Sequence, residues 1–225
     1  MGFNESTHAF IAARYFRRMQ TAFGERAEPA FVHAVQYYAH QRGRRMAQRA
    51  IRDGAPLTFT NFLRYGELKM TDEVEPTQRA LVSRAPDYEL HITACPWHAQ
   101  FARMGCQDAG AVYCRYIDEA LCRGFSPDIP FEALSSLNSA DRCVHRVRGA
   151  GLEASPDEPP MEAYKKDFSY HCGHLYWSLH EVVCAIFDAG GEAVAAGVLA
   201  DVADAYGAPM AGELSAWRNT NFNVC

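Results

Sequence analysis

Cysteine and histidine occur together in the segment Cys95-Pro96-Trp97-His98, at a predicted strand-to-helix junction. A thiol at a helix N-terminus gains thiolate character from the helix dipole and the unpaired N–H groups, which makes it a better nucleophile. The alternative is a small buried thiol beside a packing tryptophan. The segment alone favours neither interpretation.

A second group, His171-Cys172-Gly173-His174, is compact enough to hold a metal ion or to pair a nucleophile with a base. At about 100° per residue, His174 lies roughly 60° from His171 on a helix, so both imidazoles can face one site. Cys172 joins them only if the helix begins here. The alternative is two histidines that form hydrogen bonds at a helix start beside an aromatic core.

Cys114, Asp118 and Cys122 recur every fourth residue and form a narrow stripe on a predicted helix. A carboxylate on an apolar side costs desolvation energy unless it has a partner, so Asp118 is either exposed at the rim of the core or engaged. The spacing alone favours the rim, with Asp118 solvated or paired with Arg115 or Arg123.

His180-Glu181-Val182-Val183-Cys184 is a near miss to the zincin signature, with Cys in place of the second His. Two ligands one turn apart on a helix can share a metal ion, and cysteine binds zinc well. The surrounding helix is apolar, however, and cysteine is among the most buried residue types. Packing of Cys184 in the core is therefore the favoured interpretation.

Arg42-Gly43-Arg44-Arg45 places three guanidinium groups near one helical turn. Such groups bind a carboxylate with bidentate geometry, although a charge run is usually a solvated face. The run is too short to indicate nucleic-acid binding.

The composition is that of an ordinary globular protein, with 225 residues of which 48% are hydrophobic and 22% are charged. A net charge of −5 has the wrong sign for neutralising phosphates, so we expect no nucleic-acid partner. No apolar stretch approaches the roughly 20 residues of a membrane span, so we expect no membrane partner. The polar, acidic N-terminus is unlike a secretory signal, which predicts a cytoplasmic location with the eight cysteines mostly as thiols.

The positions of apolar and turn-forming residues predict helices, then strands, then helices. Residues 79–93 predict one or two strands, and residues 131–137 and 142–148 predict a strand pair. Helices are expected over residues 10–23, 28–52, 98–104, 109–123, 168–187 and 192–206, followed by a tail with little pattern over 207–225. This order favours an α+β fold, an antiparallel sheet with helices packed on it, over alternating βαβ units.

We therefore expect a single domain over residues 1–225. Its parts are an N-terminal helical part (1–56), a mixed strand and helix core (57–149), a loop rich in Gly, Pro and acidic residues (150–163) and C-terminal helices (164–225). No dinucleotide-binding, P-loop or nucleophile-elbow motif occurs, so the Cys, His and Asp residues remain the candidates for chemistry.

Taken in order, these segments resemble the L-2-amino-thiazoline-4-carboxylic acid hydrolase family. The matching blocks are His40-Gln41-Arg42-Gly43-Arg44-Arg45-Met46-Ala47, Cys95-Pro96-Trp97 with Phe101 and Gly105, Val112-Tyr113-Cys114 with Ile117-Asp118, Gly124-Phe125-Ser126-Pro127, Cys143 with Arg146 and Arg148, and His171-Cys172-Gly173-His174-Leu175-Tyr176-Trp177. The chain departs from the family at Ser126, usually Asn, and at His145 and Val147, usually aromatic. The family is also distantly similar to ligand-binding domains of the 4-vinyl-reductase type, which supports an α+β fold by analogy.

The resemblance implies a hydrolase that opens a small nitrogen- and sulfur-containing ring, 2-aminothiazoline-4-carboxylate or a related cyclic amidine with its carbon–nitrogen bonds. In that reaction Asp118 would hold the amidinium, while a thiol would attack covalently or an imidazole would activate water. An arginine would bind the substrate carboxylate. The implied catalytic residues are Cys95, Cys114, Asp118, His171 and His174, and the implied substrate-binding residues are Arg42, Arg44, Arg45, Trp97, Tyr113 and Tyr176.

The resemblance leaves the cofactor and the exact reaction open. No cofactor is established, although Cys95, His98, His171 and His174 make a divalent metal such as zinc a candidate. One alternative is a biosynthetic relative that catalyses another ring opening, ring closure or C–N cleavage. Another is a non-catalytic sensor of a small molecule or metal. We expect a small-molecule substrate as partner and allow for a homo-oligomer.

Overall fold

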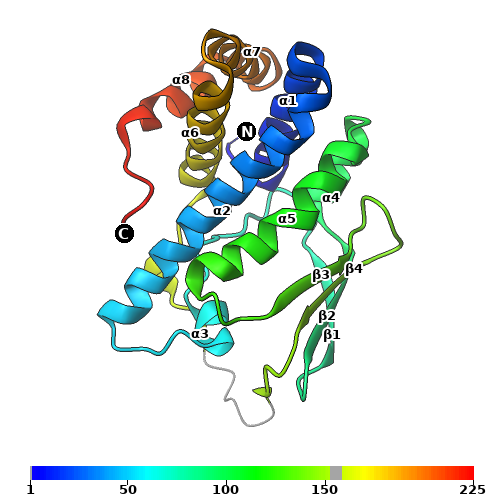
Figure 1. Cartoon of the computed structure of the whole chain (residues 1–225), viewed down its shortest axis with the longest axis vertical. Helices are drawn as coiled ribbons and strands as arrows, with labels where there is room; N and C mark the ends of the chain where they lie inside the picture. The colour runs from blue at the N-terminus through cyan, green and yellow to red at the C-terminus, as the bar shows by residue number, and fades with distance from the viewer. Residues whose placement is uncertain (1, 153–158) are drawn as a thin grey trace.

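A computed structural model describes residues 2–152 and 159–225. Its centre is formed by three long helices, α1 (Glu5–Phe23), α2 (Ala27–Arg52) and α6 (Phe168–Phe187), with the sheet to one side (Figure 1). Asn4 caps α1 by accepting a hydrogen bond from the backbone N–H of Thr7, 3.1 Å away. Asp167 caps α6 in the same way through the N–H of Tyr170.

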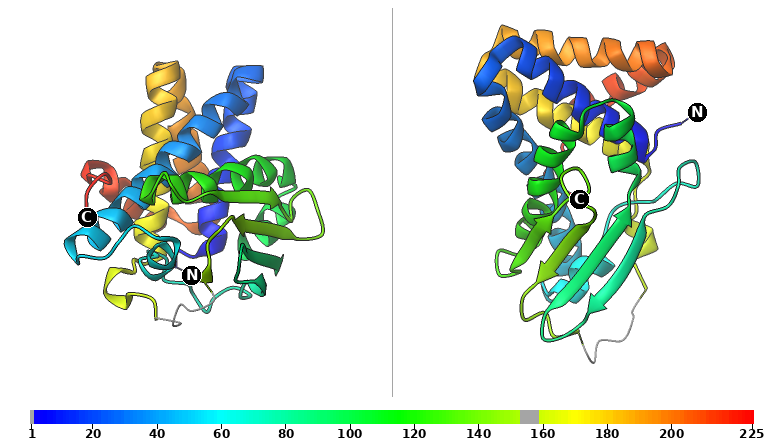
Figure 2. Two further views of the ribbon diagram at one scale, coloured as in Figure 1. Left: turned by 60° about the horizontal axis from the view of Figure 1, so that its bottom comes forward. Right: turned by 90° about the vertical axis from the view of Figure 1, so that its right-hand side faces the viewer.

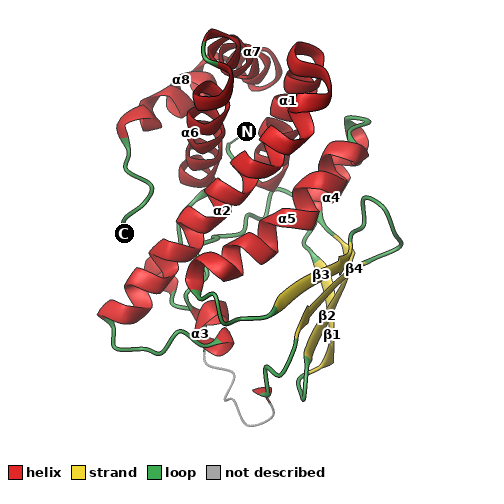
Figure 3. Ribbon diagram, in the orientation of Figure 1, coloured by secondary structure: helices red, strands yellow, loops and turns green. Residues whose placement is uncertain are grey.

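The four strands form one antiparallel sheet in the order β1-β2-β4-β3. The strands are β1 (Gln78–Ser83), β2 (Tyr88–Ala94), β3 (Phe131–Ser135) and β4 (Cys143–Val147). Figure 3 shows that the strands are grouped apart from the helices, so the fold is α+β, as the sequence predicts. The two strands within residues 79–93 and the strand pair after residue 131 are confirmed.

Two helices connect the sheet to the helical layer. Strand β2 leads directly into α4 (Pro96–Arg103), whose N-cap is Cys95, and α5 (Gln107–Phe125) follows. Helix α5 packs against both α2 and β3, which places it between the helices and the sheet (Figure 2).

Helices α2 and α5 cross at two glycines. A Cβ atom on Gly43 would lie 2.2 Å from the carbonyl oxygen of Leu121, and one on Gly124 would lie 2.6 Å from that of His40. Both distances are too short for any larger residue, so glycine sets the closeness of this contact. Gly43 lies between Arg42 and Arg44, so this close contact fixes the helix that carries both arginines.

The C-terminal region contains helices α7 (Ala189–Tyr206) and α8 (Ala208–Ala216) and a 3-10 turn at Trp217–Asn219. The expectation of a tail with little pattern after residue 207 is therefore wrong. Helix α8 begins after Gly207, has Pro209 in its first turn, and buries Met210, Ala211 and Leu214. Its short apolar stripe is held by packing on α6 and α7 rather than by strong periodicity.

The remaining elements are short. Helix α3 (Phe59–Arg64) follows α2, and a 3-10 turn at Glu162–Tyr164 precedes α6. Part of the predicted loop over residues 150–163, namely residues 153–158, lies outside the described residues. None of the described helices is both long enough and apolar enough to cross a membrane.

Candidate active site

The buried carboxylate of Glu67 forms ion pairs with three arginines from one face of α2. Arg45 donates to it through Nε at 3.0 Å and Nη2 at 2.8 Å, and Arg49 donates through Nη1 at 2.8 Å. Arg42 lies farther away, with 3.7 Å between its Nε and Glu67 Oε2. The spacing of residues 42, 45 and 49 is that of one helix face. Sequence analysis singled out Arg42 and Arg45 but neither Arg49 nor the acidic partner Glu67.

The three arginines of the Arg42-Gly43-Arg44-Arg45 segment have different surroundings. Arg45 is fully buried, and it also donates to the backbone carbonyl of Phe222 and to His174. Arg44 is exposed. Arg42 is buried, and its guanidinium lies over the Tyr38 ring, 5.6 Å from the centroid. Only Arg42 therefore combines burial with a weakly engaged guanidinium.

Arg42 has hydrogen-bonding capacity to spare. Its Nε atom is buried and has no hydrogen-bond partner among the described residues. Burial by itself lowers the pKa of Arg42, but its acidic neighbours, Tyr38 and Glu67 foremost, raise that pKa overall. Arg42 is thus a buried cation with an open N–H donor.

His171 presents an open acceptor. Its Nε2 lies 3.0 Å from the backbone carbonyl of Glu67, so Nε2 carries the proton and donates. Its Nδ1 is buried and has no partner among the described residues. Burial, and then the charge of Arg42, holds the pKa of His171 well below its usual value. The imidazole is therefore neutral, with a free lone pair on Nδ1.

His174 has both ring nitrogens engaged. Arg45 donates to Nδ1 across 3.3 Å, and Nε2 donates to the side-chain oxygen of Gln41 at 2.9 Å. Its ring stacks on Phe222, with centroids 4.4 Å apart. His171 and His174 look equivalent in the sequence but differ in their contacts. His174 contacts α2 and the C-terminal segment through both ring nitrogens and its ring face, whereas His171 is hydrogen-bonded at one nitrogen only.

A third histidine, His8 of α1, belongs to the same network and was missed by sequence analysis. Trp97 donates through Nε1 to His8 Nδ1 at 3.0 Å. The tryptophan can only donate, so the neutral His8 ring carries its proton on Nε2, which lies 2.9 Å from the Tyr38 hydroxyl. Burial foremost lowers the pKa of His8 well below its usual value. No spacing in the sequence connects His8 to Trp97 or Tyr38.

The thiols gather at the junction of the sheet with α4 and α5. Asn138 donates to Cys114 Sγ at 3.4 Å, and the backbone N–H of Leu137 donates to Cys143 Sγ at 3.3 Å. Burial raises the pKa of Cys95, which the backbone N–H groups of Trp97 and His98 only partly offset. Burial also raises the pKa of Cys114 well above its usual value. These thiols are therefore protonated at neutral pH.

Asp118 lies one turn beyond Cys114 on α5, with 39% of its side chain exposed. Its Oδ2 lies 3.6 Å from Nε2 of His145 on β4. Arg123, one of the partners that the sequence suggests, instead forms an ion pair with Glu119. Asp118 thus sits at the rim, opposite His145 of β4.

The rings of Tyr113 and Trp97 both pack against the His8 ring, with centroids 6.3 and 6.0 Å away. Tyr113 is buried, and its pKa is raised by burial foremost, with a lowering contribution from Arg42 and a raising one from Asp118. Trp97, two residues after Cys95, donates a hydrogen bond to His8. Tyr176 lies elsewhere, since its hydroxyl donates to the carbonyl of Ala195 on α7.

Side-chain contacts thus link Arg42, Trp97 and Tyr113 through Tyr38 and His8. His171 packs against Phe168, which also contacts Trp97. Cys114 follows Tyr113 on α5, and Asp118 is one turn farther along the same helix.

One surface hollow and one group of metal-ligating side chains lie apart from these residues. A hollow at the turn between α1 and α2 is lined by Gln20, Gly24, Glu25, Glu28 and Pro29. Within residues 2–152 and 159–225, the one group with closely spaced ligand atoms is His180, Cys184 and Glu192. It contains His180 and Cys184 of the near-zincin segment but none of Cys95, His98, His171 and His174, among which a metal stays a prediction.

A family model described as L-2-amino-thiazoline-4-carboxylic acid hydrolase matches residues 4–144. The match covers more than half of the chain. The protein belongs to the L-2-amino-thiazoline-4-carboxylic acid hydrolase family. No curated protein and no solved structure matches the chain, so the distant similarity to 4-vinyl-reductase-type domains stays a prediction.

Membership of the L-2-amino-thiazoline-4-carboxylic acid hydrolase family supports the general class of hydrolase. The matched range contains Arg42, Glu67, Cys95, Cys114 and Asp118. His171 and His174 lie beyond it, on α6. The geometry of α6 is therefore separate evidence about the site.

Proposed function

We propose that the protein hydrolyses a small cyclic amidine carboxylate of the 2-aminothiazoline-4-carboxylate type. The observation that carries the proposal is a pair of open polar atoms in an otherwise bonded network, the Arg42 Nε donor and the His171 Nδ1 acceptor. Buried polar groups are normally hydrogen-bonded, and an exception calls for an explanation such as a catalytic role or a bound water molecule. An anionic substrate and a water molecule would supply the missing partners.

Arg42 is the proposed receptor for the substrate carboxylate. Arg45 uses its guanidinium on Glu67, Phe222 and His174, and Arg44 faces solvent. A guanidinium that binds a carboxylate in a buried setting forms strong, charge-assisted hydrogen bonds. The weaker contact of Arg42 with Glu67, at 3.7 Å, leaves it able to turn toward a second carboxylate.

His171 is the proposed general base. Its neutral Nδ1 would take a proton from water as the oxygen adds to the amidine carbon, and its Nε2–H stays fixed on the Glu67 carbonyl. The charge of Arg42 contributes to the low pKa of His171. A carboxylate bound to Arg42 would offset that charge, so substrate binding itself would make His171 a stronger base.

Asp118 is proposed to hold the amidinium through paired hydrogen bonds, since its carboxylate is partly exposed and lies next to the thiols. Ring opening breaks a bond from the amidine carbon to the ring sulfur or nitrogen, and that atom takes up a proton. The sum of substrate and water is a carbamoyl cysteine. A protonated Cys95 or Cys114 suits proton donation here better than covalent attack.

The experiment is incubation of the purified protein with 2-aminothiazoline-4-carboxylate and detection of carbamoyl cysteine by mass spectrometry. We expect Arg42→Gln to raise KM by about tenfold or more, because a buried charge-assisted contact with the carboxylate is lost. Arg44→Gln is the matched control, for which we expect an unchanged KM. Binding of the compound without any product would instead support the sensor alternative.

A further inference from the structure

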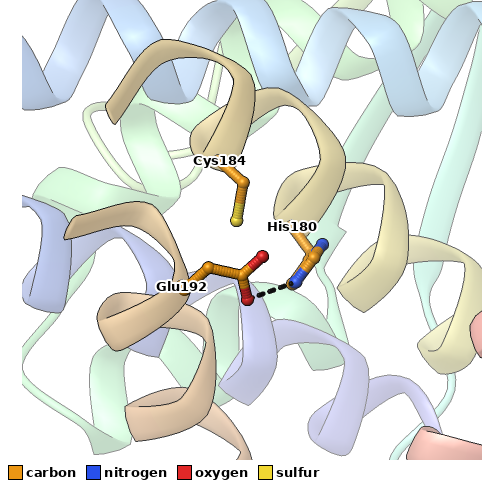
Figure 4. A group of neighbouring side chains, drawn as sticks. All are labelled: His180, Cys184 and Glu192. Carbon is orange, nitrogen blue, oxygen red and sulfur yellow. Dashed lines mark hydrogen bonds and ion pairs between the residues drawn. The ribbon is translucent and has the colours of Figure 1, made fainter. Parts of the chain in front are cut away.

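His180, Cys184 and Glu192 bring three kinds of metal-ligating atom together (Figure 4). His180 and Cys184 are one turn apart on α6, and Glu192 is in the first turn of α7. His180 Nε2 lies 3.0 Å from Glu192 Oε2, and one ligand atom from each residue lies within 4.8 Å of the others.

The turn between α6 and α7 places Glu192 against the two α6 residues. Asp188 ends one helix and begins the next, and it alone among the described non-glycine residues has a positive φ, of 48°. A Cβ atom on Gly191 would lie 2.7 Å from Cα of Cys184. Glycine at this position therefore lets the start of α7 rest on the backbone of α6, beside Cys184.

These three residues suit a divalent transition metal. In a tetrahedral zinc site, bonds of about 2.0–2.3 Å hold neighbouring ligand atoms roughly 3.4 Å apart, and the spacings here need only small side-chain movements to match. A thiolate and a carboxylate balance the two charges of the metal, and the imidazole completes three ligands. Thiolate and imidazole ligands favour Zn²⁺ over Mg²⁺ or Ca²⁺.

We propose that His180, Cys184 and Glu192 form a binding site for a divalent transition metal of the zinc class, with water as the fourth ligand. Metal binding forms a metal–sulfur bond and releases the Cys184 thiol proton to solvent. His180 lies nine residues after His171, about half a turn around α6, so the site faces away from the proposed base. The metal joins α6 to α7, and the site is independent of the proposed hydrolase activity.

Cobalt is the probe for the site, because a thiolate bound to Co²⁺ gives a charge-transfer band in the near-ultraviolet. We expect the full-length protein to develop this band with one equivalent of Co²⁺ and to lose it on adding Zn²⁺. The Cys184→Ser variant should lose the band, and Glu192→Gln should weaken Co²⁺ binding by about tenfold or more. Cys225→Ser, at an exposed thiol, is the control that keeps the band.

Thermal unfolding gives a second readout. Zn²⁺ should raise the melting temperature of the wild type by roughly 4 °C or more, and that of Cys184→Ser by much less. If Cys184→Ser does not fold, the comparison rests on Glu192→Gln, whose side chain is exposed. The proposal is overturned if the cobalt band persists in Cys184→Ser. It is also overturned if the wild type shows neither a cobalt band nor a change of melting temperature with Zn²⁺.

Discussion

At the scale of single residues, hydrogen-bond partners separate side chains that look equivalent in the sequence. His171 and His174 share a helix face, but His174 is held at both nitrogens by Arg45 and Gln41. His171 is held at one nitrogen only. A histidine that must accept a proton needs an open lone pair, so the role of base falls to His171.

The protonation states of the thiols and of His171 predict the pH dependence of turnover. Burial raises the pKa values of Cys95 and Cys114, and burial lowers that of His171. If neutral His171 activates water, kcat/KM should be flat between about pH 7 and pH 9 and should fall only well below pH 6.5. A pH–rate profile from pH 5 to 9 checks this.

Covalent attack by a thiolate would give a different profile. Below a raised thiol pKa the thiolate fraction grows about tenfold per pH unit, so kcat/KM would climb steadily through that range. That rise would replace His171 by Cys95 or Cys114 as the group that starts the reaction.

The sequence identified most residue types of the candidate site but not their connections. The resemblance pointed to Arg42, Cys95, Cys114 and Asp118, because these residues lie in ordered blocks. Glu67, His8 and Tyr38 were missed, since each is a single residue whose partners are far away in the sequence. Contacts of that kind arise from tertiary packing, which the local periodicity of a sequence does not reveal.

At the scale of elements, Glu67 joins three otherwise separate segments. Its side chain binds arginines of α2, and its backbone carbonyl accepts from His171 of α6. Replacement by Gln would leave two buried guanidinium groups without a charged partner, so we expect Glu67→Gln to lower the free energy of unfolding by about 3–5 kcal/mol. Urea denaturation measures this loss.

A surface ion pair provides the matched control. Glu162 is paired with Lys165, but 74% of its side chain is exposed. Exposed pairs contribute about 0–1 kcal/mol, so Glu162→Gln should change stability little. Equal effects of the two substitutions would show that the Glu67 network is not a structural centre.

Because α2 and α5 cross closely at Gly43, we expect a single added methyl group there to destabilise the protein strongly. In Gly43→Ala, the new Cβ would meet the backbone of Leu121, which cannot move aside as a flexible side chain does. We expect destabilisation by more than about 2 kcal/mol and displacement of the neighbouring Arg42. Thermal unfolding and the KM for the carboxylate substrate should both respond.

Gly212 is the control for this substitution. It is an exposed residue of α8, and no neighbouring atom lies within 4 Å of the place that a new methyl group would take. Gly212→Ala should therefore be neutral or stabilising by up to about 1 kcal/mol. If Gly43→Ala changes stability as little as Gly212→Ala does, α2 and α5 do not cross as closely as this structure shows.

Elements with strong local patterns were predicted well. The apolar helix over residues 168–187 has the predicted bounds, and both strand pairs follow β-forming runs. The α8 helix was missed because its nine residues carry only a short apolar stripe. Packing against neighbouring helices, rather than propensity, decides whether such a segment is helical.

At the scale of the whole molecule, buried neutral histidines make stability depend on pH. The pKa values of His8, His171 and His174 are all lowered, chiefly by burial. Below pH 6.5 these histidines bind protons in the unfolded chain but not in the folded one. The free energy of unfolding should therefore fall as the pH drops below 6.5.

The size of this effect follows from the number of protons. Each histidine can lower the free energy of unfolding by up to about 2 kcal/mol between pH 7.5 and pH 5. Urea denaturation at these two pH values measures the sum, and His174→Gln should reduce the difference by one histidine's share. A stability that stays constant over this range would mean that the three histidines are not buried as neutral groups.

Turnover of 2-aminothiazoline-4-carboxylate by His171→Gln and His174→Gln, measured beside the wild type, shows whether His171 is the base of the hydrolase. With His171 as the base, kcat of His171→Gln should fall by about 10²–10⁴-fold while the protein stays folded. His174→Gln should mainly lower the melting temperature and keep most of its kcat. A wild type that releases no carbamoyl cysteine would rule out the proposed hydrolysis, and a His171→Gln variant with the wild-type kcat would rule out His171 as the base.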